Sequence, residues 1–141
     1  MYNKKKILVK EIIIKNNKIP VLREQSLLKE ALEKMSSNKF GICFCVNKKG
    51  KLIGILTDGD IRRKILNVQK PFSALLNDDL ILHINKKPSK IREEYSLLSV
   101  LKLMKKKLIW DLPVVDKNNK LIGMLHLQSI VNLLIKKNIQ I

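Results

Sequence analysis

The sequence is poor in the residues that mark several common protein classes. Its 141 residues include only two cysteines, five glycines and four prolines, and aromatic residues make up 4%. Two cysteines cannot build the disulfide framework of a small secreted domain, so we expect a reducing, cytoplasmic setting. Apolar runs stay far below the roughly 18–20 residues of a bilayer span, so no membrane partner is expected. Residues 1–10 are cationic without an apolar core, so no signal peptide is expected either.

Acidic residues are also scarce, and the formal net charge is +17. Such a charge is typical of proteins that bind nucleic acid or anionic membranes. Only four of the 29 basic residues are arginines, however, and nucleic-acid binders favour arginine for its bidentate contacts. The lysines are spread along the whole chain. We therefore interpret most of the charge as solvated surface, and nucleic-acid binding is retained only as an alternative.

The most informative feature present is an internal repeat. The sequence KLIGIL at residues 51–56 returns as KLIGML at residues 120–125, which is 69 positions later. Agreement at this offset extends over much of the chain, which is typical of tandem repeats. The sequence therefore predicts two repeats, at residues 7–70 and 75–141.

The repeat is less regular near its start. There an offset of 68 pairs residues 11–14 with residues 79–82, and Pro20 with Pro88. One residue inserted before the first helix of the second repeat would account for the change. Both repeats are thus expected to begin with an equivalent leading strand.

Each repeat has the same predicted order of elements after that strand. Apolar residues at i, i+3, i+4 and i+7 predict an amphipathic helix. They are Leu28, Ala31, Leu32 and Met35 in the first repeat, and Leu97, Val100, Leu101 and Met104 in the second. Residues 42–46 and 51–56 predict two strands joined by a tight turn. Gly50, like Asn119 in the second repeat, tolerates the positive φ that such a turn often requires.

A second helix is predicted to close each repeat. Its buried side would carry Ile61 and Ile65 in the first repeat, and Ile130, Leu133 and Leu134 in the second. Each repeat is therefore strand, helix, strand, strand, helix. One such unit is too small for a substantial core. We therefore predict an α/β (α+β) fold in which the two repeats pack as one pseudo-symmetric unit.

The second strand of the first repeat runs into the sequence GILTDGD at residues 54–60. This string resembles the signature of the CBS domain (named for cystathionine β-synthase): Gly, two apolar residues, Thr or Ser, two variable residues, Asp. CBS domains occur as tandem pairs of this size, so the resemblance covers essentially the whole chain. The longer string TDGDIRR, residues 57–63, is similar to the CBS pair at the C-terminus of arabinose-5-phosphate isomerases of the KpsF/GutQ family. Sugar nucleotidyltransferases with an N-terminal CBS pair share this type of string.

The resemblance implies a non-catalytic regulatory module of the Kdo/lipopolysaccharide precursor pathway, without a metal or a permanently bound cofactor. Its implied ligand is ATP, ADP, AMP or a sugar nucleotide, held in the clefts between the repeats. It also implies a homodimer and a partner sugar isomerase domain outside this sequence. The alternatives are a structural dimerisation module with vestigial sites and the CBS pair of a nucleotidyltransferase.

Candidate ligand-binding residues of the first repeat follow from the chemistry of the motif. The Asp60 carboxylate can accept both hydroxyl protons of a ribose, and Thr57 offers a hydroxyl where helix N–H groups favour phosphate. Arg62 or Arg63 can hold a phosphate through bidentate contacts. By resemblance, apolar contacts to the base come from Ile19, Pro20 and Val21. The structural alternative is that Asp58, Asp60 and Thr57 only cap a helix, with both arginines on a solvated face.

The second repeat departs from the signature, because His126 replaces the threonine and Ser129 replaces the aspartate. A serine cannot accept two hydroxyl protons as a carboxylate does. We therefore predict a weak or empty second site, in which His126 is retained as a candidate contact to phosphate or hydroxyl. Two other features are interpreted structurally: Cys43 and Cys45 share one strand face as core thiols, and Trp110 is expected to pack at a strand edge, with a stacking platform as the alternative.

Overall fold

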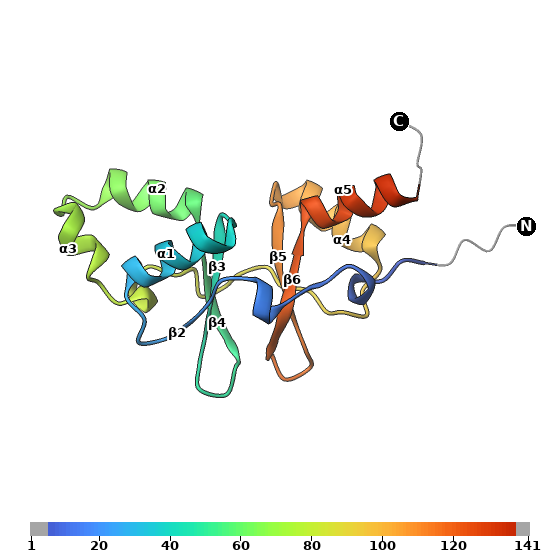
Figure 1. Ribbon diagram of the computed structural model, residues 1–141, viewed down its shortest axis with the longest axis horizontal. Helices are drawn as coiled ribbons and strands as arrows, with labels where there is room; N and C mark the ends of the chain where they lie inside the picture. Colours follow the sequence, from blue (N-terminus) through green and yellow to red (C-terminus); the bar gives the residue numbers. More distant parts are fainter. Residues whose placement is uncertain (1–5, 138–141) are drawn as a thin grey trace, which may run out of the picture.

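Two similar halves lie side by side along the long axis of the molecule, which a computed structural model describes over residues 6–137 (Figure 1). The first half contains β2 (Val21–Arg23), α1 (Leu28–Asn38), β3 (Ile42–Val46), β4 (Leu52–Thr57) and α2 (Asp58–Asn67). The second contains α4 (Leu97–Lys107), β5 (Asp111–Val115), β6 (Leu121–His126) and α5 (Leu127–Lys136). The short elements are β1 (Ile14–Lys15), α3 (Phe72–Leu76) and the 3-10 turns η1 (Val9–Glu11), η2 (Asn16–Lys18) and η3 (Leu80–Leu82).

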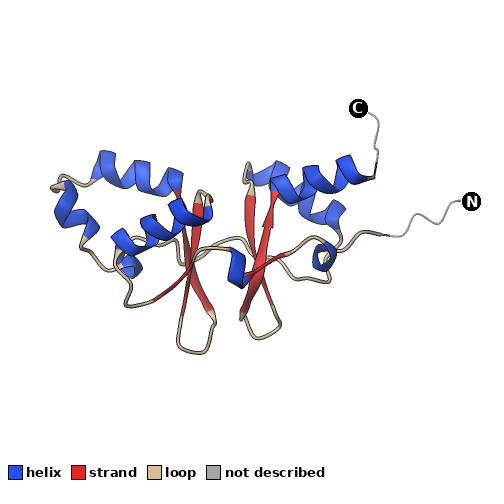
Figure 2. Cartoon of the chain, in the orientation of Figure 1, coloured by secondary structure: helices blue, strands red, loops and turns tan. Residues whose placement is uncertain are grey.

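The local structure follows the predicted patterns closely. Helix α1 buries Leu28, Ala31 and Met35, as its apolar spacing predicts. The hairpin turns place Gly50 at φ 79° and Asn119 at φ 63°, which confirms the predicted left-handed positions. Two three-stranded sheets result, with strand orders β2-β3-β4 and β1-β6-β5, and they lie between the helices (Figure 2).

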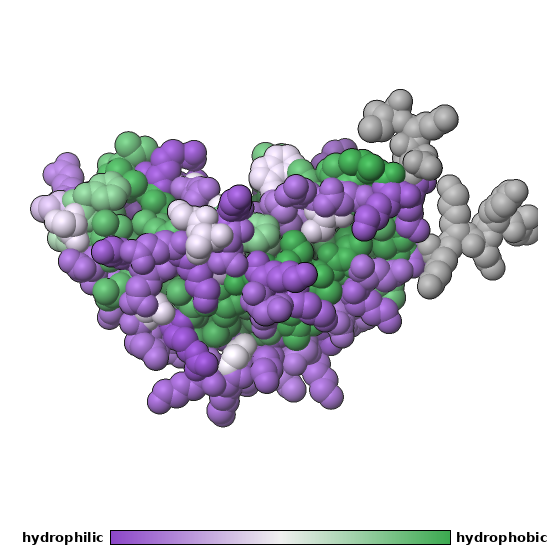
Figure 3. All heavy atoms as spheres, in the orientation of Figure 1, coloured by the Kyte–Doolittle hydropathy of each residue, from purple (hydrophilic) through white to green (hydrophobic). Residues whose placement is uncertain are grey.

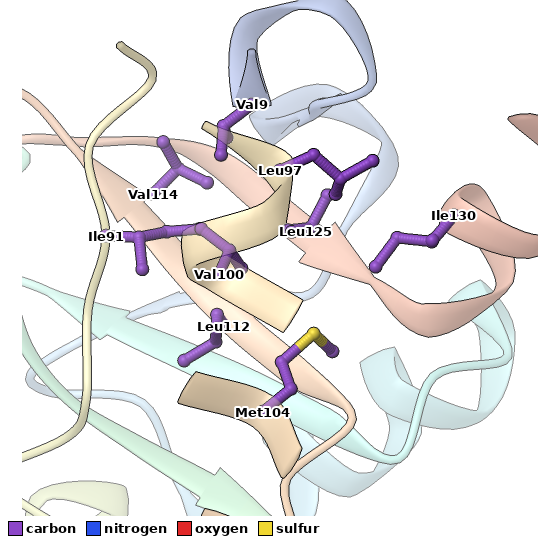
Figure 4. Close-up of a cluster of buried hydrophobic side chains, with 9 residues drawn as sticks. All are labelled: Val9, Ile91, Leu97, Val100, Met104, Leu112, Val114, Leu125 and Ile130. Carbon is purple, nitrogen blue, oxygen red and sulfur yellow. The ribbon is translucent and has the colours of Figure 1, made fainter. Parts of the chain in front are cut away.

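The two repeats exchange their leading segments. Val9 of the first repeat is fully buried in the core of the second, where it packs with Leu97, Leu125 and their neighbours (Figure 4). Leu80 of the second repeat is buried in the core of the first. β1 pairs with β6 through Ile14 and Met124, and Asn85 forms the corresponding bridge with Ile55. Neither repeat therefore has a complete core without the other.

This exchange corrects the predicted alignment of the leading segments. The equivalent turns are Val9–Glu11 and Leu80–Leu82, which lie 71 positions apart rather than 68. The offset is 69 again at Leu22 and Ile91, which bridge equivalent residues of β3 and β5. The predicted offset was wrong because short apolar stretches match one another in several registers.

The predicted leading strand of the second repeat is also wrong. Where β2 pairs along three residues of β3, the second repeat has only the bridge between Ile91 and Val114. In the first repeat the amide of Phe44 donates to the carbonyl of Pro20 at 2.9 Å. The residue equivalent to Phe44 is Pro113, which has no amide hydrogen to donate.

A third core cluster joins the two sheets, which confirms that the repeats form one unit. Its buried residues come from both halves: Ile19, Ile42, Phe44, Val46, Leu52, Val115, Leu121 and Met124. The hairpins also bond to each other, because Leu52 donates to the Asn119 carbonyl and Leu121 donates to the Gly50 carbonyl, both at 3.0 Å. The cleft described below therefore lies between two halves that share a core cluster.

The closing helices are less buried than predicted. Ile130 is buried, but Ile65 and Leu134 are 42% and 39% exposed. Part of the apolar face of each closing helix is therefore left open. No helix within residues 6–137 combines the length and the apolar character needed to cross a bilayer.

Candidate ligand-binding cleft

A cavity of about 750 Å³ lies between the two repeats. The first repeat contributes the end of β4 and the first turns of α2. The second contributes its leading segment and the junction of α4 with β5. The polar and aromatic lining residues are Thr57, Asp58, Arg62, Arg63, Asn85, Lys87, Ser89, Lys107, Trp110 and Asp111. This volume falls in the range of small-molecule and cofactor sites.

The start of α2 forms one wall of this cavity and is held by a capping box. Thr57 is the N-cap: its Oγ1 accepts from the Asp60 amide at 3.2 Å, and its own amide donates to Asp60 Oδ2 at 2.9 Å. This arrangement confirms that Thr57 caps the helix. The neighbouring helix N–H groups give this wall a positive partial charge that suits an anion.

The Asp60 carboxylate is already engaged inside the protein. Its Oδ1 accepts from Arg63 Nη2 at 2.8 Å, in addition to the Thr57 amide on Oδ2. Burial acts to raise the pKa of Asp60, but the hydrogen bonds from Arg63 and Thr57 outweigh it and hold the pKa below its usual value. Asp60 lines a separate cavity of about 310 Å³ rather than the larger one, and Arg63 lines both.

Replacing Asp60 by alanine is expected to lower the free energy of unfolding by about 1 kcal/mol at pH 7, because the capping box is lost. Since the pKa of Asp60 is lowered in the folded state, its contribution is present at neutral pH and disappears as the pH falls through that lowered value. Chemical denaturation at pH 7 and at pH 3 measures both effects. Asp58→Ala is the control, since it removes a first-turn charge outside the capping box. Equal losses in the two variants at pH 7 would contradict this account.

Positive charge dominates the lining of the larger cavity. Arg62 and Arg63 come from the first repeat, and Lys87 and Lys107 come from the second. Lys107 Nζ donates to Ser89 Oγ at 2.8 Å, which holds the lysine at the wall. Two carboxylates, Asp58 and Asp111, also line the cavity, so cations outnumber anions by four to two. A ligand with a phosphate group matches this balance.

Trp110 lies at the cleft and is 61% exposed, so the predicted edge packing is wrong. Helix α4 ends at Lys107, its C-cap Leu108 is left-handed with φ 55°, and the chain then turns toward β5. The tryptophan therefore lies just outside the sheet, where no neighbouring strand covers its ring. An exposed indole beside a cationic cavity can stack on a planar base.

The corresponding region of the second repeat brings His126 together with Asp111 and with Phe40 of the first repeat. His126 Nδ1 is hydrogen-bonded to Asp111 Oδ1, and the Phe40 ring meets the imidazole edge-on with ring centres 5.4 Å apart. Burial raises the pKa of Asp111, the bond to His126 opposes this, and the charge of Asp58 adds to it. Neither His126 nor Ser129 lines the larger cavity.

None of Ile19, Pro20 and Val21 lines the larger cavity, whereas Thr57 does. Ile19 and Pro20 are buried, and Val21 belongs to β2. The segment that does face the α2 wall comes from the other repeat, through Lys87 and Ser89. Sequence reasoning grouped the motif with its own leading segment and so missed these residues. The signal that points to them is the repeat itself, because Ser89 follows Pro20 by 69 positions.

The two cysteines lie in the core of the first repeat, as predicted. Burial raises the pKa of Cys43 to about 12 and that of Cys45 to about 11, so both are thiols at neutral pH. Among residues 6–137, no group of three or more His, Cys, Asp or Glu side chains is arranged to hold a metal ion.

Comparison with known proteins gives consistent matches along the chain. The family model described as "CBS domain" matches residues 9–67 and again residues 79–136. A CBS domain-containing protein of Dictyostelium discoideum is 31% identical over 140 residues, which cover 93% of each chain. An uncharacterised protein of Helicobacter pylori is 30% identical over 134 residues, 94% of this chain but 39% of that protein. The arabinose 5-phosphate isomerase KdsD of Francisella tularensis is 28% identical over 129 residues, 89% of this chain and 37% of that enzyme. The chain thus spans about two fifths of the length of several curated relatives.

Solved structures show the same fold. CBSX2 in complex with AMP has a TM-score of 0.82 and 21% identity, over 94% of this chain and 99% of that chain. The CBS domain pair of protein MJ0100, in complex with 5-methylthioadenosine and S-adenosyl-L-methionine, has a TM-score of 0.79 and 22% identity, over 95% of this chain and all of that chain.

Proposed function

The chain belongs to the CBS domain family, with two copies of the domain, and we propose that this pair is a cytoplasmic, non-catalytic regulatory module that binds an adenine nucleotide. The observation that carries the proposal is the cavity of about 750 Å³ between the repeats, with two cationic side chains from each. A ligand held by both repeats couples its own binding to their relative position, which is what a regulatory module requires.

The phosphate of the nucleotide is assigned to the cationic end of the cleft. Arg62 and Arg63 are placed beside the N-terminus of α2, and Lys87 and Lys107 reach the cavity from the second repeat. Charge-assisted hydrogen bonds to phosphate are stronger than neutral ones. Thr57 lies at the same wall, next to the first amides of the helix.

The base and the ribose are assigned to other groups of the site. Trp110 provides an exposed indole for stacking, and Ile42 and Ile55 provide apolar lining. Asp60, which lines the adjoining smaller cavity, is the carboxylate that suits the two ribose hydroxyls. The complexes of similar structures with AMP and with S-adenosyl-L-methionine support an adenosine ligand.

Isothermal titration with AMP, ADP, ATP and a sugar nucleotide tests the proposal. We expect saturable binding of at least one adenine nucleotide at one molecule per chain, because the second repeat has His126 and Ser129 where the motif of the first has Thr57 and Asp60. Absence of heat and of thermal stabilisation at millimolar concentrations would contradict nucleotide binding. Two molecules per chain would contradict the prediction of a weak or empty second site.

We also propose that the module is a homodimer through α2 and α5. Both helices leave large apolar side chains exposed, and Figure 3 shows hydrophobic surface over α5 along the upper edge. The residues are Ile65 and Leu66 on α2, and Val131, Leu134 and Ile135 on α5. Large exposed apolar side chains on two helices along the same edge of the molecule are typical of a protein–protein interface (Figure 1).

The expected result of analytical ultracentrifugation is a dimer for the wild type and a monomer for Leu66→Glu combined with Ile135→Glu. Each glutamate would place a charge in the apolar contact, where its burial is unfavourable. Leu98→Glu on α4 is the control, since Leu98 is 63% exposed and lies outside these two helices. A dimer that survives the double substitution, or a monomeric wild type, would contradict this interface.

The partner proposed for the module is a sugar isomerase domain of the Kdo/lipopolysaccharide precursor pathway. The similarity to the isomerase of Francisella tularensis supports this assignment over the nucleotidyltransferase alternative. The test is to read the genomic sequence upstream and downstream and to identify which domains it encodes. A sugar isomerase domain encoded upstream is the expected finding, whereas a nucleotidyltransferase domain downstream would contradict it.

A further inference from the structure

Arg63 separates two cavities of different character. On one side it lines the larger cleft, whose other cations suit phosphate. On the other side it lines the cavity of about 310 Å³ that Asp60, Lys64, Asn67 and Asn85 also line. The carboxylate suited to ribose hydroxyls thus faces a different space from Arg62, Lys87 and Lys107. The side chains of Arg63 and Asn85 line both spaces and form the wall between them.

The contact that holds this wall is specific. Arg63 Nη2 donates to Asp60 Oδ1 at 2.8 Å, and Oδ2 accepts from the Thr57 amide, so both oxygens of the carboxylate are engaged. The same two contacts lower the pKa of Asp60, and their effect exceeds the opposing effect of burial. While Arg63 stays in place, a ribose hydroxyl has to compete with the guanidinium for Asp60 Oδ1.

The ion pair is of a kind that a ligand can open. It joins residues three apart on α2, and the Arg63 side chain is 58% exposed. Exposed pairs of this sort are weak, whereas an arginine can bind a phosphate through two parallel hydrogen bonds. A phosphate in the cleft would compete directly with Asp60 for the same guanidinium.

We infer that Arg63 is a specificity-determining residue that closes the Asp60 carboxylate to ligands without phosphate and opens it to phosphorylated ones. This inference rests on the proposed nucleotide site. The phosphate draws the guanidinium toward the cleft, and the freed Oδ1 then accepts the ribose hydroxyls. A nucleoside has the hydroxyls but no phosphate to compete for Arg63, so the Asp60 carboxylate stays bonded to the guanidinium.

Arg62 is the matched control for Arg63. It follows the same motif and lines the same cleft, but Asp60 bonds to Arg63 and not to Arg62. Removing Arg62 takes one cation from the phosphate region and leaves the Asp60–Arg63 pair intact. Removing Arg63 takes one cation away and also frees Asp60. The two variants therefore differ in what they do to a nucleoside.

The test is isothermal titration of AMP and adenosine into the wild type, Arg63→Ala and Arg62→Ala. Arg63→Ala should bind adenosine about three- to tenfold more tightly than the wild type does, which matches the modest strength of an exposed ion pair. Its preference for AMP over adenosine should fall. Arg62→Ala should weaken AMP binding without strengthening adenosine binding. Thermal unfolding checks that both variants, changed at exposed positions, remain folded.

The outcomes separate this inference from the proposed function. If folded Arg63→Ala binds adenosine no more tightly than the wild type, the role of Arg63 is overturned, whether or not the wild type binds AMP. If Arg62→Ala gains the same adenosine affinity, the role is not specific to Arg63 and is also overturned. If the wild type binds no nucleotide, the proposed function fails, while tighter adenosine binding by Arg63→Ala would still support the closed carboxylate.

Discussion

Gly123→Ala is expected to lower the free energy of unfolding by about 2–3 kcal/mol, the largest stability effect that we predict for a single methyl group. A Cβ at this position would lie 2.3 Å from the Ile14 carbonyl oxygen and 2.7 Å from Ile13 Cγ1. The oxygen belongs to the backbone of β1, which pairs with β6 at this point. The methyl group would therefore force the exchanged segment away from the sheet of the other repeat.

Gly59→Ala is the matched control for this substitution. Its Cβ would meet only the Arg63 guanidinium nitrogens at 3.3 Å, which sit at the end of a flexible side chain. Because Gly59 lies within α2, alanine there is expected to be neutral or to stabilise by up to about 1 kcal/mol. Urea denaturation of both variants gives the comparison. If Gly123→Ala is as stable as Gly59→Ala, then β1 does not cross β6 as closely as described.

The second large effect concerns the cleft. Arg62→Ala combined with Lys107→Ala is expected to weaken AMP binding by about 100-fold or more, since each lost hydrogen bond to a charged group contributes about 1.5–3 kcal/mol. The two residues come from different repeats and line one cavity. A site that lay within either repeat alone would lose affinity in one single variant and not in the other.

Lys48→Ala combined with Lys117→Ala is the control for the change in net charge. Both lysines lie in the turns of the hairpins, at the opposite end of the strands from the helices (Figure 1). The control also removes two positive charges, so it should reproduce any effect of net charge on AMP binding. Such an effect is screened by salt. An equal loss of AMP affinity in the two double variants would show that surface charge, and not the cleft, accounts for binding.

The sequence predicted most of the local structure, because the information for it is local. The apolar spacing of α1 and α4, the strand at Ile42–Val46 and the left-handed Gly50 and Asn119 all depend on neighbouring residues. The exchange of leading segments depends on contacts between distant residues, such as Val9 with the second core. The apolar character of a residue in a short segment predicts that its side chain will be buried. It does not predict which repeat will bury that side chain.

In the candidate site, too, the residues of a local motif were predicted and those that depend on distant contacts were not. Thr57, Arg62 and Arg63 were identified from one continuous motif, and all three line the cleft. Lys87, Ser89 and Lys107 carry no motif, so only the pairing of the repeats places them opposite α2. The exposure of Trp110 was also missed, because it depends on the left-handed Leu108 at the C-cap of α4.

The central claim is that the cleft between the repeats binds an adenine nucleotide, and Trp110 reports on it directly. It is the only tryptophan of the chain, it lines the cavity, and it is 61% exposed. Titration with AMP should produce a saturable change in tryptophan fluorescence. In the Arg62→Ala/Lys107→Ala variant the AMP concentration needed for half of this change should be about 100-fold higher. An emission spectrum that stays unchanged up to millimolar AMP, or an equal response from that variant, would contradict the account.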